Sequence, residues 1–187
     1  MSLPSFLEPL TPIHPLQSTA SVKSPVGGSA GSRSLPFNMQ IQQESNWCWA
    51  ATTSSVSAFY DPSSGWTQCN VATACLGQSC CVTSAPCNQT FTLDGPLGTT
   101  SNLANFFNGG DSWGNVQQEI DQSRLVCCHI GWFGGGGHFV AISGYDSLTA
   151  DLYIDDPLYG SATVPYSTFL NSYRGSGQWD FSYYTQP

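Results

Sequence analysis

The spacing of apolar residues changes near Arg124, and this change constrains the fold more than any other feature of the chain. Upstream of Arg124, apolar residues recur every four or seven positions, which is typical of one face of a helix. Downstream, short runs rich in β-branched and aromatic residues are separated by glycine-rich or polar turns, which indicates strands. Helices followed by an antiparallel sheet define the α+β class, and the chain contains no internal repeat.

The predicted elements follow from these patterns. Helices are expected at residues 48–60, 101–107, 113–122 and 166–173. Ser45 or Asn46 can cap the first helix and Pro62 ends it, while Asp111 or Ser112 can cap the third. Strands are expected at residues 125–132, 138–145, 151–155, 162–165 and 178–184.

The composition predicts one folded domain with an N-terminal leader. Residues 1–36 are rich in serine, proline and glycine and lack periodicity, so they are expected to be disordered. They can serve as a passive tail, a removable prosegment or a type III export signal, and no secretory signal peptide is visible. The folded domain should span residues 37–187, where 40% apolar and 13% aromatic residues over the whole chain are enough for a core.

The charge balance and the lengths of the apolar runs argue against two classes of partner. Four lysines and arginines face twelve acids, and eleven of these acids follow residue 38. Such an acidic surface repels phosphate backbones, so we expect no nucleic-acid binding. No apolar run approaches the ~20 residues that cross a bilayer, so we expect no membrane insertion.

Five of the eight cysteines crowd into residues 69–87, within a segment (66–96) that is expected to be a loop with short turns. Their C-x5-C-x4-C-C-x5-C spacing lacks the paired knuckles of structural zinc sites. Disulfides are therefore favoured over zinc, which implies an oxidising destination. The connectivity stays open, as does the state of the vicinal pair Cys127 and Cys128. With Cys48 set aside, at least one further thiol must stay free or pair between chains.

Cys48 stands between two tryptophans at the expected start of the first helix. Backbone N–H groups and the helix dipole stabilise a thiolate at such a position. A buried cysteine at a helix start is, however, more often inert packing than a nucleophile. The assignment therefore depends on partners elsewhere in the chain.

The histidines narrow the choice of a base for this thiol. His14 falls in the expected leader, and His129 falls in the middle of a strand. His138 opens a strand after four glycines, where backbone can lie close to a cleft, so it is the favoured base. These glycines predict a hairpin and not a phosphate-binding loop, because no Gly-Lys-Ser/Thr follows them.

The acid that orients this histidine must come from the aspartates downstream. Asp156 ends the strand at 151–155 and precedes a proline, so it is favoured over Asp155, while Asp146 is expected in a turn. Gln42, six residues before Cys48, can donate to an oxyanion. Nucleophile, base, acid and oxyanion donor together form a thiol hydrolase site that needs no metal or cofactor.

Several sequence blocks resemble papain-like cysteine proteases. They are Gln-Gln-x-Ser-Asn-Trp-Cys-Trp-Ala-Ala at 42–51, Trp-Thr-Gln-Cys at 66–69, Cys-Cys at 80–81, Cys-Asn at 87–88, Gly-His-Phe-Val at 137–140 and Asp-Pro at 156–157. The resemblance runs from about Phe37 to the C-terminus. It is strongest to the bacterial branch of avirulence effectors that plant pathogens inject into host cells, and weaker to bacteriocin-processing peptidases, which share the last two blocks.

The resemblance implies a two-lobe papain-like fold, with an N-terminal helical lobe and a C-terminal antiparallel sheet. It assigns the nucleophile to Cys48, the general base to His138, the orienting acid to Asp156 and the oxyanion donor to Gln42. It also implies export into a host cell and a host protein target. Effectors of this branch usually cut their own N-terminal region, but no clear self-cleavage motif precedes Phe37.

We therefore expect a monomeric endopeptidase that acts on a protein or peptide through an acyl-thioenzyme. Two alternatives stay open. The same residues can serve a transglutaminase or deamidase, and the cysteine cluster suits a non-catalytic, disulfide-stapled binding module. Pairing of Cys48 in a disulfide would favour the binding module.

Overall fold

The computed structural model describes residues 31–187. Most of the expected leader lies outside the described residues. Residues 31–36 belong to the fold, because Ser32–Ser34 form strand β1 and Leu35 is buried. The folded part therefore begins before Phe37, the expected start.

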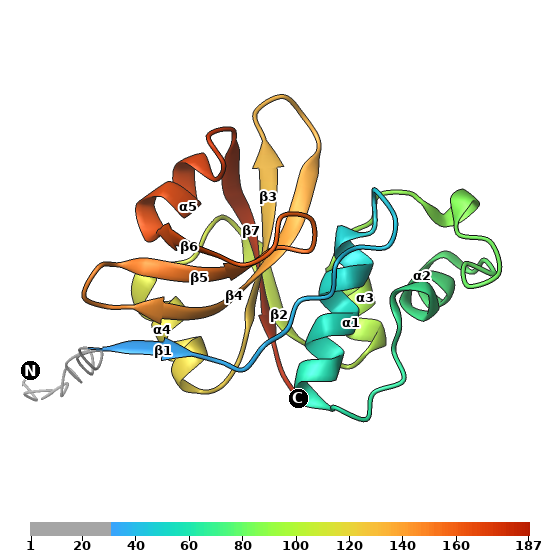
Figure 1. The fold of residues 1–187 in the computed structure, drawn as a ribbon, viewed down its shortest axis with the longest axis horizontal. Helices are drawn as coiled ribbons and strands as arrows, with labels where there is room; N and C mark the ends of the chain where they lie inside the picture. Colours follow the sequence, from blue (N-terminus) through green and yellow to red (C-terminus); the bar gives the residue numbers. More distant parts are fainter. Residues whose placement is uncertain (1–30) are drawn as a thin grey trace, which may run out of the picture.

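Helices gather on two sides of a twisted sheet (Figure 1). The helices are α1 (Cys48–Tyr60), α2 (Gln68–Leu76), α3 (Asp94–Thr99), α4 (Trp113–Asp121) and α5 (Tyr166–Ser172), with a 3-10 turn at Ala85–Cys87. Helices α1 to α3 lie to the right of the sheet in the view of Figure 1, whereas α4 and α5 lie against its left part. The predicted helix at 48–60 is confirmed, and those at 113–122 and 166–173 are confirmed to within one residue.

The described residues form one seven-stranded antiparallel sheet, so the α+β class is confirmed. Its further strands are β2 (Leu103–Asn108), β3 (Val126–Trp132), β4 (Gly137–Asp146), β5 (Asp151–Asp155), β6 (Ala162–Pro165) and β7 (Gly177–Thr185). The order is β2-β7-β3-β4-β5-β6, and β1 pairs with the far end of β4. The five predicted strands thus appear as β3 to β7.

The predicted helix at residues 101–107 is wrong, because this segment forms β2 on the edge of β7. Successive residues of β2 meet aromatic partners on opposite faces of the sheet. The ring centroid of Phe106 lies 6.3 Å from that of Tyr183, and that of Phe107 lies 5.4 Å from that of Tyr184. Cross-strand aromatic pairs of this kind favour a strand over a short helix.

The segment 66–96, expected as a loop, contains α2 and the start of α3. The side chain of Thr67 accepts a hydrogen bond from the N–H of Asn70, as an N-cap does. Gly77 ends α2 in the left-handed conformation, at φ 65°. Both end signals are present in the sequence, but the many cysteines around them obscured the helix.

Helix α1 is almost wholly interior, since residues 48–57 are all buried. Several of its buried hydroxyls bond back to its own carbonyls: Thr53 Oγ1 donates to Trp49 O at 2.8 Å and Ser55 Oγ to Ala51 O at 2.6 Å. Such bonds allow small polar residues in an interior helix, and Thr52 Oγ1 is the exception, buried without a partner among the described residues. The expected cap is wrong: Trp47 is the N-cap residue, with no side-chain capping bond.

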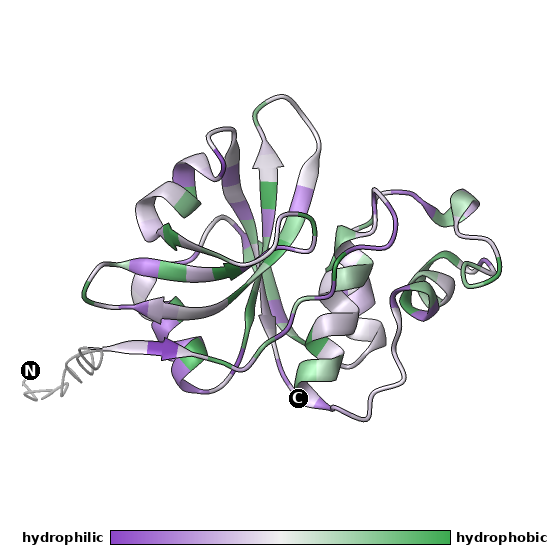
Figure 2. Ribbon diagram, viewed as in Figure 1, coloured by the Kyte–Doolittle hydropathy of each residue, from purple (hydrophilic) through white to green (hydrophobic). Residues whose placement is uncertain are grey.

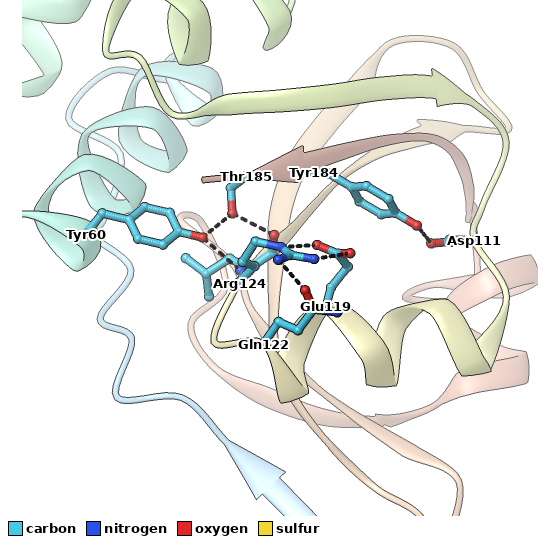
Figure 3. A network of polar contacts seen from close by, with 8 residues as sticks. Tyr60, Asp111, Glu119, Gln122, Arg124, Tyr184 and Thr185 are labelled. Atoms are coloured by element: carbon cyan, nitrogen blue, oxygen red, sulfur yellow. Dashed lines mark hydrogen bonds and ion pairs between the residues drawn. The ribbon is translucent and has the colours of Figure 1, made fainter. Parts of the chain in front are cut away.

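A polar network joins the helical part to the sheet (Figure 3). Tyr60, at the end of α1, bonds its hydroxyl to Thr185 Oγ1 on β7 at 2.7 Å and accepts from the N–H of Leu125 at 3.3 Å. Beside it, Arg124 makes a two-pronged ion pair with Glu119, at 2.6 and 2.7 Å.

The hydropathy colouring shows apolar bands alternating with polar ones along β5, as expected for a strand with one buried face (Figure 2).

The cysteine cluster forms two disulfides, Cys69–Cys81 and Cys80–Cys87. They tie the end of the cysteine-rich segment to α2. Cys48, Cys75, Cys127 and Cys128 carry free thiols, so the vicinal pair on β3 is not bridged. None of the helices in residues 31–187 combines the length and apolar composition of a bilayer-crossing segment.

Candidate active site

Cys48 is the first residue of α1 and is 9% exposed. Two tryptophans fix the chain around it. Trp47 Nε1 donates to Cys87 O at 2.8 Å, and Trp49 Nε1 donates to Gln89 O at 3.0 Å. Both rings are fully buried, so they pack and anchor residues 87–89 beside the nucleophile helix.

His138 is the second residue of β4 and bridges two of the predicted site residues. Its Nε2 lies 2.7 Å from Asp156 Oδ1, and Cys48 lies close enough to its ring to influence its pKa. Burial lowers the pKa of His138, but the bonds and charges of Asp156 and Cys48 outweigh this and raise it from 6.5 to about 9. The imidazole is thus held in its charged form near neutral pH.

Asp156 directly follows β5, and its side chain is completely buried. Oδ1 also accepts the backbone N–H groups of Leu158 at 2.8 Å and Tyr159 at 3.0 Å, and Oδ2 accepts the Tyr173 hydroxyl at 2.8 Å. Burial raises the pKa of Asp156, but the bond and charge of His138 and these donors outweigh burial and lower it below 3.8. The carboxylate is therefore ionised and fixed toward His138.

The rival residues have other partners. Asp155 accepts the hydroxyls of Ser143 at 2.5 Å and Ser161 at 2.6 Å. Asp146 accepts the N–H of the residue two positions on, as expected for a turn. His129 pairs with Asp180 on β7, with 2.6 Å between Nδ1 and Oδ1. The structure brings together Cys48, His138 and Asp156, and not these rivals.

Gln42 lies in the segment of residues 37–47 that leads into α1, here called the strap. Its N–H donates to Pro157 O at 2.9 Å. Its side-chain Nε2 donates to the carbonyls of Glu44 at 3.0 Å and Ser45 at 2.8 Å. Its Oε1 is buried and has no hydrogen-bond partner among the described residues. In this arrangement both Nε2 hydrogens are engaged within the strap.

Cys48 and His138 line a pocket of about 240 Å³ between the helical part and the sheet. Its walls are of mixed character, with aromatic side chains beside polar ones. The other lining residues are Ser45, Asn46, Trp49, Thr90, Phe91, His129, Trp132, Gly137, Phe139, Leu158 and Tyr159. A cleft that offers both apolar surface and hydrogen-bonding groups suits a peptide segment. Within residues 31–187, no cluster of three or more His, Cys, Asp or Glu is placed to hold a metal ion.

The sequence did not predict four side chains that surround the His138–Asp156 pair. The ring of Trp132 stacks on that of His138, with 6.1 Å between centroids, and the Tyr159 ring meets it edge-on at 6.0 Å. Tyr173 and Arg174 approach Asp156 from the end of α5. Of these four, only Tyr159 could have been suspected from the sequence, because it lies three residues after Asp156.

A fold with a cysteine at a helix start, and a histidine and acid on a facing antiparallel sheet, defines a papain-like cysteine protease. The chain belongs to the family described as "Papain-like cysteine protease AvrRpt2", whose profile matches residues 29–174. It is therefore a hydrolase of the cysteine peptidase class. None of the curated protein sequences matches the chain.

Two solved structures share the fold. One is a double glycine motif protease from an AMS/PCAT transporter, in complex with the leader peptide. It has a TM-score of 0.52 and 16% identity over 83% of this chain and 95% of its own. The other is xylellain, a cysteine protease from Xylella fastidiosa, with a TM-score of 0.52 and 11% identity over 83% of this chain and 86% of its own.

Proposed function

We propose that the chain is an endopeptidase whose nucleophile is Cys48, with His138 as general base and Asp156 as the orienting acid. One observation carries this proposal: His138 is hydrogen-bonded to Asp156 and lines the same open pocket as Cys48. A raised imidazole pKa favours a thiolate–imidazolium pair, in which the proton already resides on His138.

The reaction follows from this pair. The Cys48 thiolate attacks the peptide carbonyl carbon, and its electron pair forms the C–S bond while the carbonyl oxygen becomes an oxyanion. His138 gives its proton to the departing amine nitrogen as the C–N bond breaks, which leaves an acyl-thioenzyme. Water then adds to the thioester carbonyl carbon, and His138 takes a proton from it as the base. The oxyanion collapses, the C–S bond breaks with its electron pair returning to sulfur, and the acid product leaves, which restores the thiolate–imidazolium pair.

The oxyanion needs donors that are already in place when it forms, after the substrate has bound. Cys48 opens α1, so its N–H has no acceptor within the helix and can serve as one donor. We propose Gln42 Nε2 as the second, which requires that it exchange its bond to Glu44 or Ser45 for the oxyanion. Its buried Oε1 has no hydrogen-bond partner, so a rearrangement that pairs this oxygen when substrate enters would be favourable.

The two alternatives make different predictions. A non-catalytic, disulfide-stapled module gains no support, since Cys48 is free and lies outside the two disulfides. A transglutaminase or deamidase would form the same kind of acyl-enzyme from a glutamine side chain and would release ammonia without cutting the chain.

Two measurements test the proposal. Wild type and Cys48→Ala are incubated with a proteome-derived peptide library, and new termini that appear only with wild type support an endopeptidase. Ammonia release from glutamine peptides without new termini would favour the alternative. In parallel, iodoacetamide labelling at pH 6 compares Cys48 with Cys75, a free and partly buried thiol whose pKa is raised by burial. If Cys48 reacts no faster than Cys75, the nucleophile assignment fails.

We also propose that the protein acts outside the bacterium that makes it and cuts a host protein. The two disulfides support an oxidising passage, and the resemblance to injected effectors supports a host target. A reporter fused to residues 1–36 should leave a type III-competent bacterium. Retention of that fusion inside the cell would contradict the export signal.

A further inference from the structure

Arg174 has a backbone conformation that L-residues seldom adopt. It follows α5 at φ 50°, and the next residue, Gly175, continues the turn at φ 77°. The left-handed region crowds Cβ against the backbone, so a glycine would be the ordinary choice at this position. Arg174 is also one of only four basic residues in the chain. Its side-chain contacts are therefore the place to look for a role.

The Arg174 side chain joins two parts of the site. Its guanidinium carbon lies 3.9 Å from the ring centroid of Tyr159 and 5.5 Å from that of Tyr173. Its Nε lies 3.8 Å from Asp156 Oδ2. A planar guanidinium over an aromatic face is a favourable cation–π contact, which an ammonium group makes with a different shape. Arg174 thus holds the loop after β5 against the turn after α5.

Tyr173 fixes the oxygen of Asp156 that does not face His138. Its hydroxyl donates to Oδ2 at 2.8 Å. Its ring is 1% exposed and packs edge-on against Phe169, with 5.3 Å between centroids. Burial raises the pKa of Tyr173 well above its ordinary value, so the hydroxyl stays a donor wherever the enzyme is folded.

Tyr159 forms the outer cover of the pair. The side chain of His138 is 6% exposed and that of Asp156 is not exposed at all, while Tyr159 is 52% exposed and the Arg174 side chain 37%. The inner bond is thus sheltered by residues that themselves face solvent. A hydrogen bond that water cannot enter is stronger, because water no longer competes for its donor and acceptor.

We propose that Tyr173 and Arg174 are positioning residues of this site: Tyr173 orients the Asp156 carboxylate, and Arg174 clamps Tyr159 over the His138–Asp156 bond. The inference rests on the proposed function, since it concerns the same pair. Neither residue lines the pocket, so both act through others.

Removal of Arg174 has two opposed effects on His138. Loss of a positive charge would favour the imidazolium, whereas loss of the clamp admits water to the Asp156 bond that keeps the imidazole charged. The first effect is small, because Arg174 is more than one-third exposed and its field is screened. The second acts on the main contact that raises the pKa of His138. The ionisable groups that face the pair are Cys48, Tyr159, Tyr173 and Arg174.

The test compares Arg174→Gln and Arg174→Lys with a matched control, Arg33→Gln. Arg33 also lies 3.8 Å from an aspartate, and its side chain is 41% exposed, but it is on β1, away from the pocket. The measurements are the pH profile of kcat/KM on a cleaved peptide and the pKa of His138, read from the pH dependence of the NMR signals of its ring protons. The NMR titration follows the charge of the imidazole directly.

Arg174→Gln should move the basic limb of the profile and the pKa of His138 to lower pH by about one unit. The loss should fall in kcat above about pH 8, with KM little changed. Arg174→Lys should recover part of it, and Arg33→Gln should match wild type. Tyr173→Phe should shift the limb in the same direction. An unmoved limb, a limb that rises, or an equal shift in Arg33→Gln would overturn the proposal. The NMR titration needs no peptide cleavage, so it decides the clamp even if the endopeptidase assignment fails.

Discussion

Replacing Asp156 by asparagine should lower the pKa of His138 while leaving its geometry nearly intact. Oδ1 of Asp156 accepts three N–H groups, from His138, Leu158 and Tyr159, and an asparagine oxygen can accept the same three. The new amide nitrogen would face the Tyr173 hydroxyl, which can rotate to accept. The substitution therefore removes the charge and keeps the acceptor.

The magnitude follows from the difference between charged and neutral hydrogen bonds. A bond to a charged group contributes about 1.5–3 kcal/mol and a neutral one about 0.5–1.5 kcal/mol. Loss of about 1.4 kcal/mol corresponds to about one pKa unit. The pKa of His138 should therefore fall from about 9 to roughly 8. The protonated fraction of His138 should drop about threefold at pH 8.5 and little at pH 7.

The assay is the pH dependence of kcat/KM for wild type and Asp156→Asn, with His138→Ala as the inactive reference. Asp156→Asn should keep much of the activity at pH 7 and lose its basic limb early. A basic limb that coincides with that of wild type would refute the claim that the Asp156 charge sets the pKa of His138. Near-complete inactivity at pH 7 in a folded protein would refute the claim that the geometry survives.

The raised pKa of His138 also makes the free energy of unfolding depend on pH. The folded pKa of His138 lies above its unfolded value of 6.5, so this group stabilises the fold fully below pH 6.5 and stops doing so as pH rises through about 9. The free energy of unfolding should fall over that window by up to about 3 kcal/mol in wild type. In Asp156→Asn the fall should be smaller by about 1.4 kcal/mol, measured by urea titration at several pH values. Parallel pH curves for the two proteins would contradict this linkage.

Three further predictions concern the scaffold. Tyr60→Phe removes the hydroxyl that joins α1 to the sheet, so the free energy of unfolding should fall by about 1–2 kcal/mol in urea titration with kcat/KM unchanged. An unchanged stability would show that this contact does not hold the two parts together. Cys80→Ser with Cys87→Ser should lower stability by about 2 kcal/mol without reductant and by less when dithiothreitol is present for both proteins. An equal gap with and without dithiothreitol would rule out the disulfide as its cause. Gly137→Ala would place a Cβ in collision with His129 Nε2, so it should cost about 1–3 kcal/mol of stability by thermal melting. A melting curve that matches wild type would mean that the His129 ring is not fixed.

Helices and strands could be predicted from the sequence where several local signals agree. The bounds of α1 followed from the apolar spacing and the proline after it, and strands β3 to β7 followed from their turns. Segment 103–108 could not be read in this way. It is short, and what makes it a strand is the open edge of β7 and the aromatic rings there. Those partners are about 75 residues downstream in the sequence.

The candidate site divides in the same way. Cys48, His138 and Asp156 could be picked from the sequence, because a thiol, an imidazole and a carboxylate are few in number and each stands at the start or end of an element. Their hydrogen bonding, and the separate partners of Asp155, appear only in the structure. The roles of these residues as catalysts stay predictions until the variants are measured.

The sequence by itself determined the class of fold and singled out the candidate reactive groups, since both depend on local spacing and residue chemistry. Only the tertiary structure decided which cysteines pair, where β2 lies and what surrounds the His138–Asp156 bond. Arg174 is the clearest case. Nothing around it in the sequence indicates a partner, yet the fold sets its guanidinium on the ring of Tyr159. Contacts between distant segments depend on how the whole chain packs, and local patterns carry no record of them.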